Sequence, residues 1–295
     1  MRKVLIIGPT GQLGADLVRV FLEKDGYEVI PAGRPAIDLC DKDSVVNTVG
    51  RHTPDIVINA AGHTDVDGCE YDSSSAMLLN AEGAGHVADA CSEAGAVCVY
   101  ISSDYVFDGK KGKPYTETDE PYPLNAYGIS KLEGERLVRG KCDRHFIIRA
   151  SGLYGLGLPA KRGHNFVETM IRLAENVGRI KIVDDQVMSP TSTQDLALKI
   201  EELLEKEDYG TYHITNSGEC SWYRFGTAIF NAAGMSPDVV PVTSEEYGAR
   251  AERPRYSVLD NAKLESTGIR RLRHWEEALR EYISLRHGRK AFPKP

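Results

Sequence analysis

Apolar and polar positions follow two alternating patterns in the first half of the chain. Short apolar stretches at residues 3–7, 28–32, 55–58, 96–101 and 145–149 predict five β-strands. Between them, apolar residues recur at helical spacing, which predicts helices over residues 13–21, 45–49, 76–94 and 127–138. Residues 3–7 form a continuous apolar run, as is typical of a strand covered on both faces.

This alternation predicts an α/β fold with a doubly wound, Rossmann-type parallel sheet. Strands that alternate with helices pair in parallel, and right-handed crossovers place the helices on both faces. We assign residues 1–150 to a dinucleotide-binding domain.

The pattern loosens after about residue 151, where Gly and Pro become frequent. Helices are predicted over residues 165–176, 193–205, 222–233 and 275–286, and short strands over 180–183, 210–214 and 239–242. We expect a smaller C-terminal α/β domain over residues 151–295 that mainly binds substrate. A segment near residues 185–215 is expected to return to the first domain.

Composition narrows the class of partner. The chain has 295 residues, 41% of them hydrophobic, and a net charge of −7. This charge gives no basic footprint for nucleic acid. No apolar run approaches the roughly 20 residues of a membrane span, so we expect no membrane contact. The six cysteines show no Cys-x-x-Cys spacing, which indicates free thiols in a reducing cytoplasm.

A glycine-rich turn follows the first strand and precedes a helix. Glycines let backbone N–H groups approach a pyrophosphate, and the helix N-terminus adds a partial positive charge. The spacing is Gly-x-x-Gly-x-x-Gly, whereas many dehydrogenases have Gly-x-Gly-x-x-Gly. The predicted cofactor contacts here are Gly8, Thr10, Gly11, Gln12, Leu13 and Gly14.

The second strand ends without the carboxylate that accepts from a ribose 2′-OH in NAD-binding proteins. Arg34 stands there instead and is placed to pair with a 2′-phosphate. We therefore expect NADPH as the preferred cofactor, with NADH also accepted. Asp38 and Leu39 are expected to border the adenine. The small residues Ala60, Ala61 and Gly62 after the third strand are expected to let the cofactor pass closely.

Tyr127 and Lys131 form a Tyr-x-x-x-Lys pair on a predicted helix. Spacing of four residues puts both side chains on one helix face. A nearby ammonium lowers the pKa of a tyrosine, which would suit Tyr127 to general acid–base catalysis. Ser103 stands at the predicted carboxyl end of a strand, where α/β sheets bind ligands, and can donate to a substrate carbonyl.

The glycine loop, the strand-end serine and the Tyr-x-x-x-Lys pair occur in the same order as in the short-chain dehydrogenase/reductase superfamily, which the chain resembles. Longer strings are similar to the dTDP-4-dehydrorhamnose reductase family, an extended branch of that superfamily. The most specific string runs from Ser103 through Asp104, Tyr105, Val106, Phe107 and Asp108 to Gly109. Further matches are Asn59-Ala60-Ala61 with Thr64, Pro123-Leu124-Asn125, Asp185-Gln186, Ser221-Trp222-Tyr223 and Arg253-Pro254.

The resemblance implies reduction of the C4 keto group of dTDP-4-dehydro-L-rhamnose to dTDP-L-rhamnose. It implies that Tyr127 protonates the developing alkoxide, that Lys131 holds the nicotinamide ribose, and that Ser103 replaces the usual threonine. It also implies that Thr64, Asp104, Tyr105 and Arg253 contact the sugar nucleotide.

Two positions depart from the family pattern. Gly152 stands where family members often have a tryptophan beside the sugar, so we expect open space there and looser sugar selection. Ala15 stands where some members have an acid of a metal site, so we expect no metal at that position.

Two alternative functions stay open. One is another nucleotide-sugar 4-ketoreductase or epimerase. The other is a non-catalytic regulatory subunit of the same fold, against which the intact Ser103, Tyr127 and Lys131 argue. The sequence leaves a homodimer open.

Overall fold

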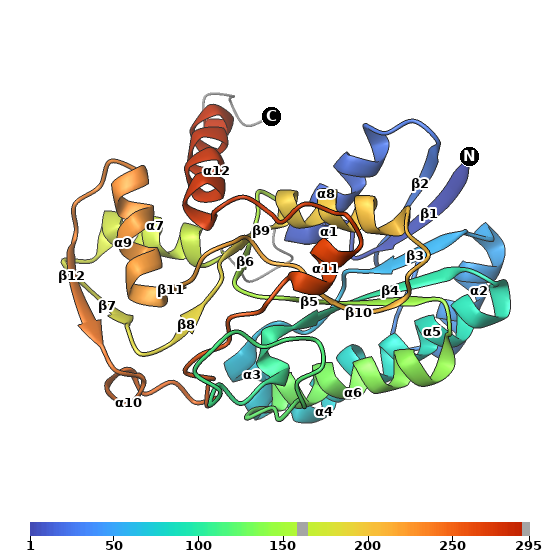
Figure 1. Cartoon of the computed structure of the whole chain (residues 1–295), viewed down its shortest axis with the longest axis horizontal. Coiled ribbons are helices and arrows are strands. Elements are labelled where there is room, and N and C mark those ends of the chain that lie inside the picture. The colour runs from blue at the N-terminus through green and yellow to red at the C-terminus, as the bar shows by residue number, and fades with distance from the viewer. Residues whose placement is uncertain (158–164, 291–295) are drawn as a thin grey trace.

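A six-stranded, all-parallel sheet forms the centre of the N-terminal lobe in this computed structural model, which describes residues 1–157 and 165–290 (Figure 1). The strand order is β10-β5-β4-β3-β1-β2. The strands are β1 (Arg2–Ile7), β2 (Tyr27–Ala32), β3 (Ile56–Asn59), β4 (Val97–Ser103), β5 (His145–Ala150) and β10 (Gly210–His213). The strand order reverses between β1 and β3, and open α/β sheets bind ligands at such a point.

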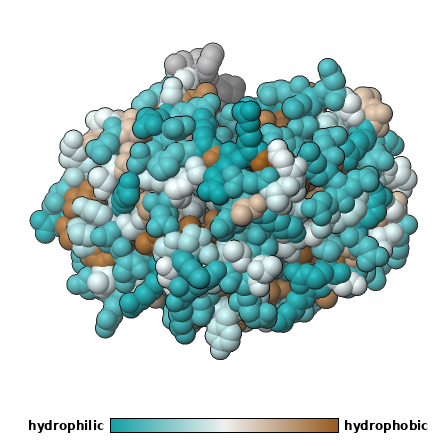
Figure 2. Space-filling view, in the orientation of Figure 1, coloured by the Kyte–Doolittle hydropathy of each residue, from teal (hydrophilic) through white to brown (hydrophobic). Residues whose placement is uncertain are grey.

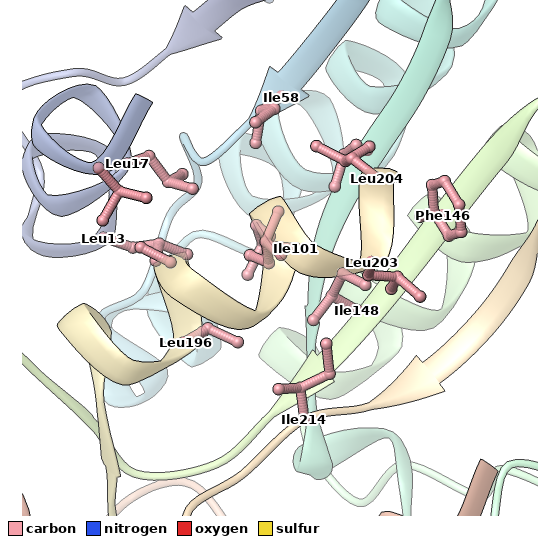
Figure 3. Close-up of a cluster of buried hydrophobic side chains, with 14 of the residues drawn as sticks. Leu13, Leu17, Ile58, Ile101, Phe146, Ile148, Leu196, Leu203, Leu204 and Ile214 are labelled. Carbon is pink, nitrogen blue, oxygen red and sulfur yellow. The ribbon is translucent and has the colours of Figure 1, made fainter. Parts of the chain in front are cut away.

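Helices cover both faces of this sheet. One face carries α1 (Gln12–Leu22), α8 (Thr193–Leu204) and α11 (Ala262–Ser266), and the other carries α2 (Lys42–His52), α5 (Gly83–Ala94) and α6 (Ala126–Lys141). Alternate residues of β1 enter opposite cores: Val4 and Ile6 pack with α1 and α8, and Leu5 and Ile7 pack with α2 and α5. Figure 3 shows the first core, in which Leu13 and Leu17 lie beside Leu196.

The C-terminal lobe packs three helices and short strands around Phe225 and Trp275 (Figure 1). The helices are α7 (Phe166–Asn176), α9 (Trp222–Ala232) and α12 (Trp275–Lys290). The strands pair as β7 (Arg179–Val183) with β12 (Asp238–Val242), β8 (Val187–Met188) with β11 (Cys220–Ser221), and β6 (Leu153–Tyr154) with β9 (Thr191–Ser192). The remaining short elements are α3 (Val66–Tyr71), α4 (Ser73–Met77), the π-helix η1 (Leu78–Glu82), the 3₁₀-helix η2 (Asp104–Val106) and α10 (Ser244–Tyr247).

The doubly wound α/β fold predicted from the sequence is confirmed, and the predicted long helices and strands differ from the observed ones by a few residues at their ends. One prediction was wrong in detail. Residues 76–94 are not one helix, because the π-helix η1 separates α4 from α5. The hydroxyl of Tyr100 donates to the carbonyl of Asn80 in η1 at 2.8 Å, and this side-chain bond accompanies the widened turn.

The surface carries no broad apolar area on the face drawn in Figure 2, where hydrophobic residues are scattered among hydrophilic ones. Within residues 1–157 and 165–290, no helix has the length and apolar character needed to cross a bilayer.

A buried ion pair joins α6 to the centre of the sheet. Arg149 of β5 makes two hydrogen bonds to Glu135 of α6, at 2.8 and 2.6 Å, and the side chains are 3% and 0% exposed. Ser102 of β4 donates to the same carboxylate at 2.6 Å. Removing one member of a buried pair leaves the other charge unpaired in a medium of low polarity, which is costly.

We therefore expect Glu135→Gln to lower the free energy of unfolding by about 3 kcal/mol or more, because Arg149 keeps its charge without a counter-ion. Urea unfolding followed by circular dichroism measures this change. Glu133→Gln is the matched control on the same helix, since Glu133 forms a surface pair with Arg136 and its loss costs at most about 1 kcal/mol. Equal losses in the two variants would contradict the prediction.

Candidate active site

The glycine turn between β1 and α1 brings three backbone segments into close contact. Gly8 has φ of +79°, and a Cβ there would lie 3.0 Å from the backbone nitrogen of Ala61. A Cβ at Gly14 would collide with the carbonyl oxygen of Gly8. The turn can therefore close onto α1 and onto the loop after β3 only with glycine at these positions.

The N-terminus of α1 is open to an anion. Its N-cap is Gly11, which makes no side-chain capping bond, and its first turn holds no acidic residue. The N–H groups of a first helical turn lack partners within the helix and attract phosphate. Thr10 is exposed beside this turn. The side chain of Leu13 is buried in the first core, so that residue could contact a cofactor through its backbone (Figure 3).

Gln12 has a partner that the sequence did not indicate. Its side-chain oxygen accepts from the backbone nitrogen of Gly155 at 2.8 Å and from the amide of Asn165 at 3.0 Å. Asn165 caps α7, so Gln12 connects the glycine turn to the C-terminal lobe.

The predicted adenosine-binding residues lie after β2. Arg34 is exposed, as a residue that meets a phosphate at the rim of a site must be. Asp38 is partly buried and accepts from the backbone nitrogen of Cys40 at 3.0 Å. Leu39 is buried against α5, where a Cβ at Gly83 would lie 3.0 Å from the Leu39 Cβ.

The loop after β3 connects the glycine turn to the predicted catalytic lysine. Ala60 and Ala61 lie against Gly8, and a Cβ at Gly62 would lie 3.3 Å from Nζ of Lys131. Asn80 of η1 holds this loop by accepting from the backbone nitrogen of His63 at 2.8 Å and donating to its carbonyl at 3.0 Å. Asn80 was missed in the sequence, where it stands within a run of helix-forming residues.

Ser103, Tyr127 and Lys131 lie together at the carboxyl end of β4, and all three are buried. Nζ of Lys131 donates to the carbonyl of Ile101 at 2.8 Å. The start of α6 is fixed by the capping side chain of Asn125 and by Glu70, whose carboxylate accepts from the backbone nitrogen of Ala126 at 2.7 Å.

The expected lowering of the Tyr127 pKa is wrong for this structure. Burial raises the pKa of Tyr127 above its ordinary value, and the hydrogen bond from Ser103 offsets a part of that rise. Lys131 directs its ammonium to Ile101, and burial lowers the pKa of Lys131 to about 8. Tyr127 therefore keeps its proton at neutral pH and can serve as a proton donor.

A cavity of about 580 Å³ is lined by residues of both lobes. Tyr105 and Arg253 both line it, as does Asp67, which the sequence did not single out. Asp67 pairs with both terminal nitrogens of Arg253 at 2.8 and 3.2 Å. Tyr105 lines the cavity with Arg253, and its ring meets that of Tyr127 edge-on at 5.9 Å. Tyr105 therefore connects the wall of the cavity to the ring of Tyr127.

Two of the predicted substrate contacts lie outside the lining of this cavity. Asp104 is 3% exposed, does not line the cavity, and accepts hydrogen bonds from three serines. The hydrogen-bonding partners of the Asp104 carboxylate are therefore serine hydroxyls of the protein. Thr64 is exposed and also lies outside the cavity lining.

Gly152 does not leave the open space that we expected. A Cβ there would lie 3.0 Å from the sulfur of Met188 and 3.2 Å from Cα of Pro190, and Gly152 has φ of +54°. The tight turn after β5 thus requires glycine, and Met188 with Pro190 fills the neighbouring volume.

In the part of the chain that the structure describes, no group of His, Cys, Asp and Glu residues is placed to hold a metal ion.

Comparisons with known proteins agree with this geometry. The RmlD substrate binding domain family matches residues 1–287. A spore coat polysaccharide biosynthesis protein, SpsK of Bacillus subtilis (strain 168), is 46% identical over 97% of this chain and 98% of its own length.

Two solved structures are similar over nearly the whole fold. The dTDP-4-dehydrorhamnose reductase of Clostridium acetobutylicum ATCC 824 is 42% identical with a TM-score of 0.92, covering 97% of this chain and 99% of that one. That of Bacillus anthracis str. Ames, in complex with NADP, is 40% identical with a TM-score of 0.90, covering 96% and 98%. The chain therefore belongs to the RmlD family of dTDP-4-dehydrorhamnose reductases.

Proposed function

We propose that this chain reduces the C4 keto group of dTDP-4-dehydro-L-rhamnose to a hydroxyl, giving dTDP-L-rhamnose, with NADPH as the reductant. One observation carries the proposal. The buried Tyr127 shares α6 with Lys131, which the loop beside the glycine turn approaches, and its ring meets that of Tyr105, which lines a cavity together with Arg253. A reductase needs these two sites to meet at one proton donor.

The glycine turn fits the cofactor, because its glycines and the open N-terminus of α1 expose backbone N–H groups. The pyrophosphate would be held by Gly8, Thr10, Gly11, Gln12, Leu13 and Gly14. The 2′-phosphate would be held by Arg34, and the adenine would lie against Asp38 and Leu39. The nicotinamide riboside would be held by Ala60, Ala61, Gly62 and Lys131. NADPH supplies the hydride. Residues 1–150 with the returning segment near 185–215 form the cofactor domain in this proposal, and the rest of 151–295 mainly forms the substrate domain.

The protein's own groups handle the proton. Tyr127 donates its hydroxyl proton to the carbonyl oxygen as negative charge develops there, so that hydride on carbon and proton on oxygen together give the alcohol. Burial favours this role, because it keeps Tyr127 protonated until an acceptor arrives. Ser103 ends β4 and lies close to the Tyr127 hydroxyl.

Arg253 is the group best suited to the diphosphate of the substrate. A guanidinium offers a planar set of donors that matches phosphate oxygens. Asp67 fixes the direction of this guanidinium, and Tyr105 connects it to the ring of Tyr127. Arg253 and Tyr105 thus place a bound sugar nucleotide relative to the proton donor.

The second candidate is another reductase that acts on a nucleotide-linked 4-keto-6-deoxysugar. It is favoured by the absence of an aromatic ring at Gly152, while the turn geometry and Met188 restrict what that position admits. An epimerase would have to retain its nicotinamide through turnover, and a regulatory subunit would not need the buried proton donor.

We also propose a cytoplasmic location and a homodimer. The first rests on six free cysteines, five of them buried. The second rests on the exposed Leu78 and Ile129 of the adjacent elements η1 and α6. Size-exclusion chromatography with light scattering tests the dimer, which a monomeric mass would contradict.

The proposed reaction is tested by following the loss of NADPH absorbance with enzymatically made dTDP-4-dehydro-L-rhamnose as the substrate. We expect this substrate to give the highest kcat/KM in a panel of nucleotide-linked keto sugars. Faster turnover of another 4-keto-6-deoxysugar would favour the second candidate. If none of these sugars led to oxidation of NADPH, both candidate functions would be contradicted.

Tyr127→Phe keeps the ring and removes the proton donor, so we expect kcat to fall by roughly 10²–10⁴-fold. Binding of NADPH, measured by fluorescence titration, should change little. Tyr122→Phe is the control, because Tyr122 is an exposed tyrosine shortly before α6. Activity of Tyr127→Phe close to that of Tyr122→Phe would remove Tyr127 from the mechanism.

Arg34→Ala removes the guanidinium proposed to meet the 2′-phosphate, so we expect KM for NADPH to rise about tenfold, since solvent around the exposed side chain screens the interaction. The KM for NADH should stay nearly constant, because NADH lacks that phosphate. Arg51→Ala, at an exposed arginine of α2, controls for the change in net charge. If both KM values rise together, Arg34 supports the adenosine or the fold and not the phosphate.

A further inference from the structure

Three serine hydroxyls from separate parts of the chain meet at the carboxylate of Asp104. Ser103 donates to one carboxylate oxygen at 2.9 Å, and Ser151 and Ser257 donate to the other at 2.8 and 2.6 Å. All four residues are buried. We call these four residues the serine cluster. Ser103 ends β4, Ser151 follows β5, and Ser257 belongs to the chain segment that carries Arg253.

The cluster fixes the direction of the Ser103 hydroxyl. A serine hydroxyl has one proton and two lone pairs. Ser103 gives its proton to Asp104, and one lone pair accepts from the backbone nitrogen of Tyr105 at 3.1 Å. Because Asp104 takes this proton, the Ser103 hydroxyl has only a lone pair left for a further partner. The carboxylate therefore determines which way the Ser103 hydroxyl points.

The Asp104 carboxylate also connects Ser103 to the chain segment that carries Arg253. Ser257 follows Arg253 by four residues. Its backbone nitrogen donates to the carbonyl of Val187 in β8 at 2.9 Å, and Val187 donates to the carbonyl of Arg255 at 2.8 Å. This segment is therefore held at both its backbone and the Ser257 hydroxyl.

A carboxylate buried among hydroxyls needs all of its donors. Burial raises the pKa of Asp104, and the hydrogen bonds from Ser257, Ser151 and Ser103 lower it. Tyr105 and Tyr127 are titratable neighbours whose pKa values are raised further by the Asp104 charge. Loss of one serine leaves part of the carboxylate unsatisfied, so the remaining hydroxyls must rearrange.

We propose that Asp104, Ser151 and Ser257 are positioning residues, which hold the Ser103 hydroxyl with its proton directed to Asp104 and keep the Arg253 segment in register with Ser103. This inference rests on the proposed reductase function and assigns Asp104 a role other than substrate contact. Ser151 and Ser257 act through Asp104, at a distance from the reacting atoms.

The test compares two buried serines. Ser257→Ala removes a donor from Asp104, and we expect kcat to fall about tenfold, the effect of about one hydrogen bond, with KM for NADPH changed less than about twofold. Ser189→Ala is the matched control, because Ser189 is equally buried at 2% exposure but donates to the carbonyl of Gly218. Its kcat should stay within about twofold of the wild type. Ser257→Thr, which keeps the hydroxyl, should recover most of the lost kcat.

Two outcomes would overturn the proposal. One is an equal loss of kcat in Ser257→Ala and Ser189→Ala, which would indicate a general effect on stability. The other comes from a crystal structure of Asp104→Ala, in which we expect Ser103 Oγ to leave its present position at the carboxyl end of β4. Retention of that Ser103 Oγ position would show that the carboxylate does not hold it. This structural readout needs no turnover, so it decides the proposal even if the wild type reduces no keto-sugar nucleotide, a result that would count against the proposed function alone.

Discussion

The close packing of α6 against the carboxyl end of β4 is the constraint on which the candidate site depends. Two glycines make it possible: a Cβ at Gly128 would collide with the carbonyl of Tyr105, and one at Gly134 with Asn80 and Tyr100. On the face of α6 that meets the sheet, Tyr127, Lys131 and Glu135 follow one another at intervals of four residues, and all are buried. Proton donor, ammonium and structural carboxylate are thus positioned by one helix docking.

This arrangement explains how a lysine can be buried without losing its charge. Burial alone disfavours the ammonium of Lys131, and the charge of Glu135, one turn further along, favours it. Glu135 is in turn held by Arg149 and Ser102. The ion pair that stabilises the sheet therefore also adjusts the electrostatics of the site, so that fold and chemistry share the same buried charges.

The sequence predicted the parts of the molecule that depend on local patterns. Apolar periodicity was enough for the long helices and the strands of the sheet, because burial on both faces leaves a strong signal in each element. It was not enough for α3, a six-residue helix that contains a glycine and has no apolar repeat. Asp67 in that helix matters through Arg253, a partner 186 residues away, and such a contact leaves no trace in local spacing. The same reason hid Asn80, whose side-chain amide bridges the β3 loop and Ser130 of α6.

The sequence suggested a substrate contact at Asp104 and open space at Gly152, and the structure differs at both positions for the same physical reason. Motif similarity says which residue type stands at a position but not which way its atoms point. Along the three residues Ser103, Asp104 and Tyr105, the chain turns from strand into a 3₁₀-helix, and successive side chains take different directions. Ser103 meets Tyr127, Asp104 turns inward to the serines, and Tyr105 reaches Arg253 at the cavity. A short string can therefore hold a catalytic group, a buried anchor and a cavity wall side by side, and only the backbone path of this turn separates the three roles.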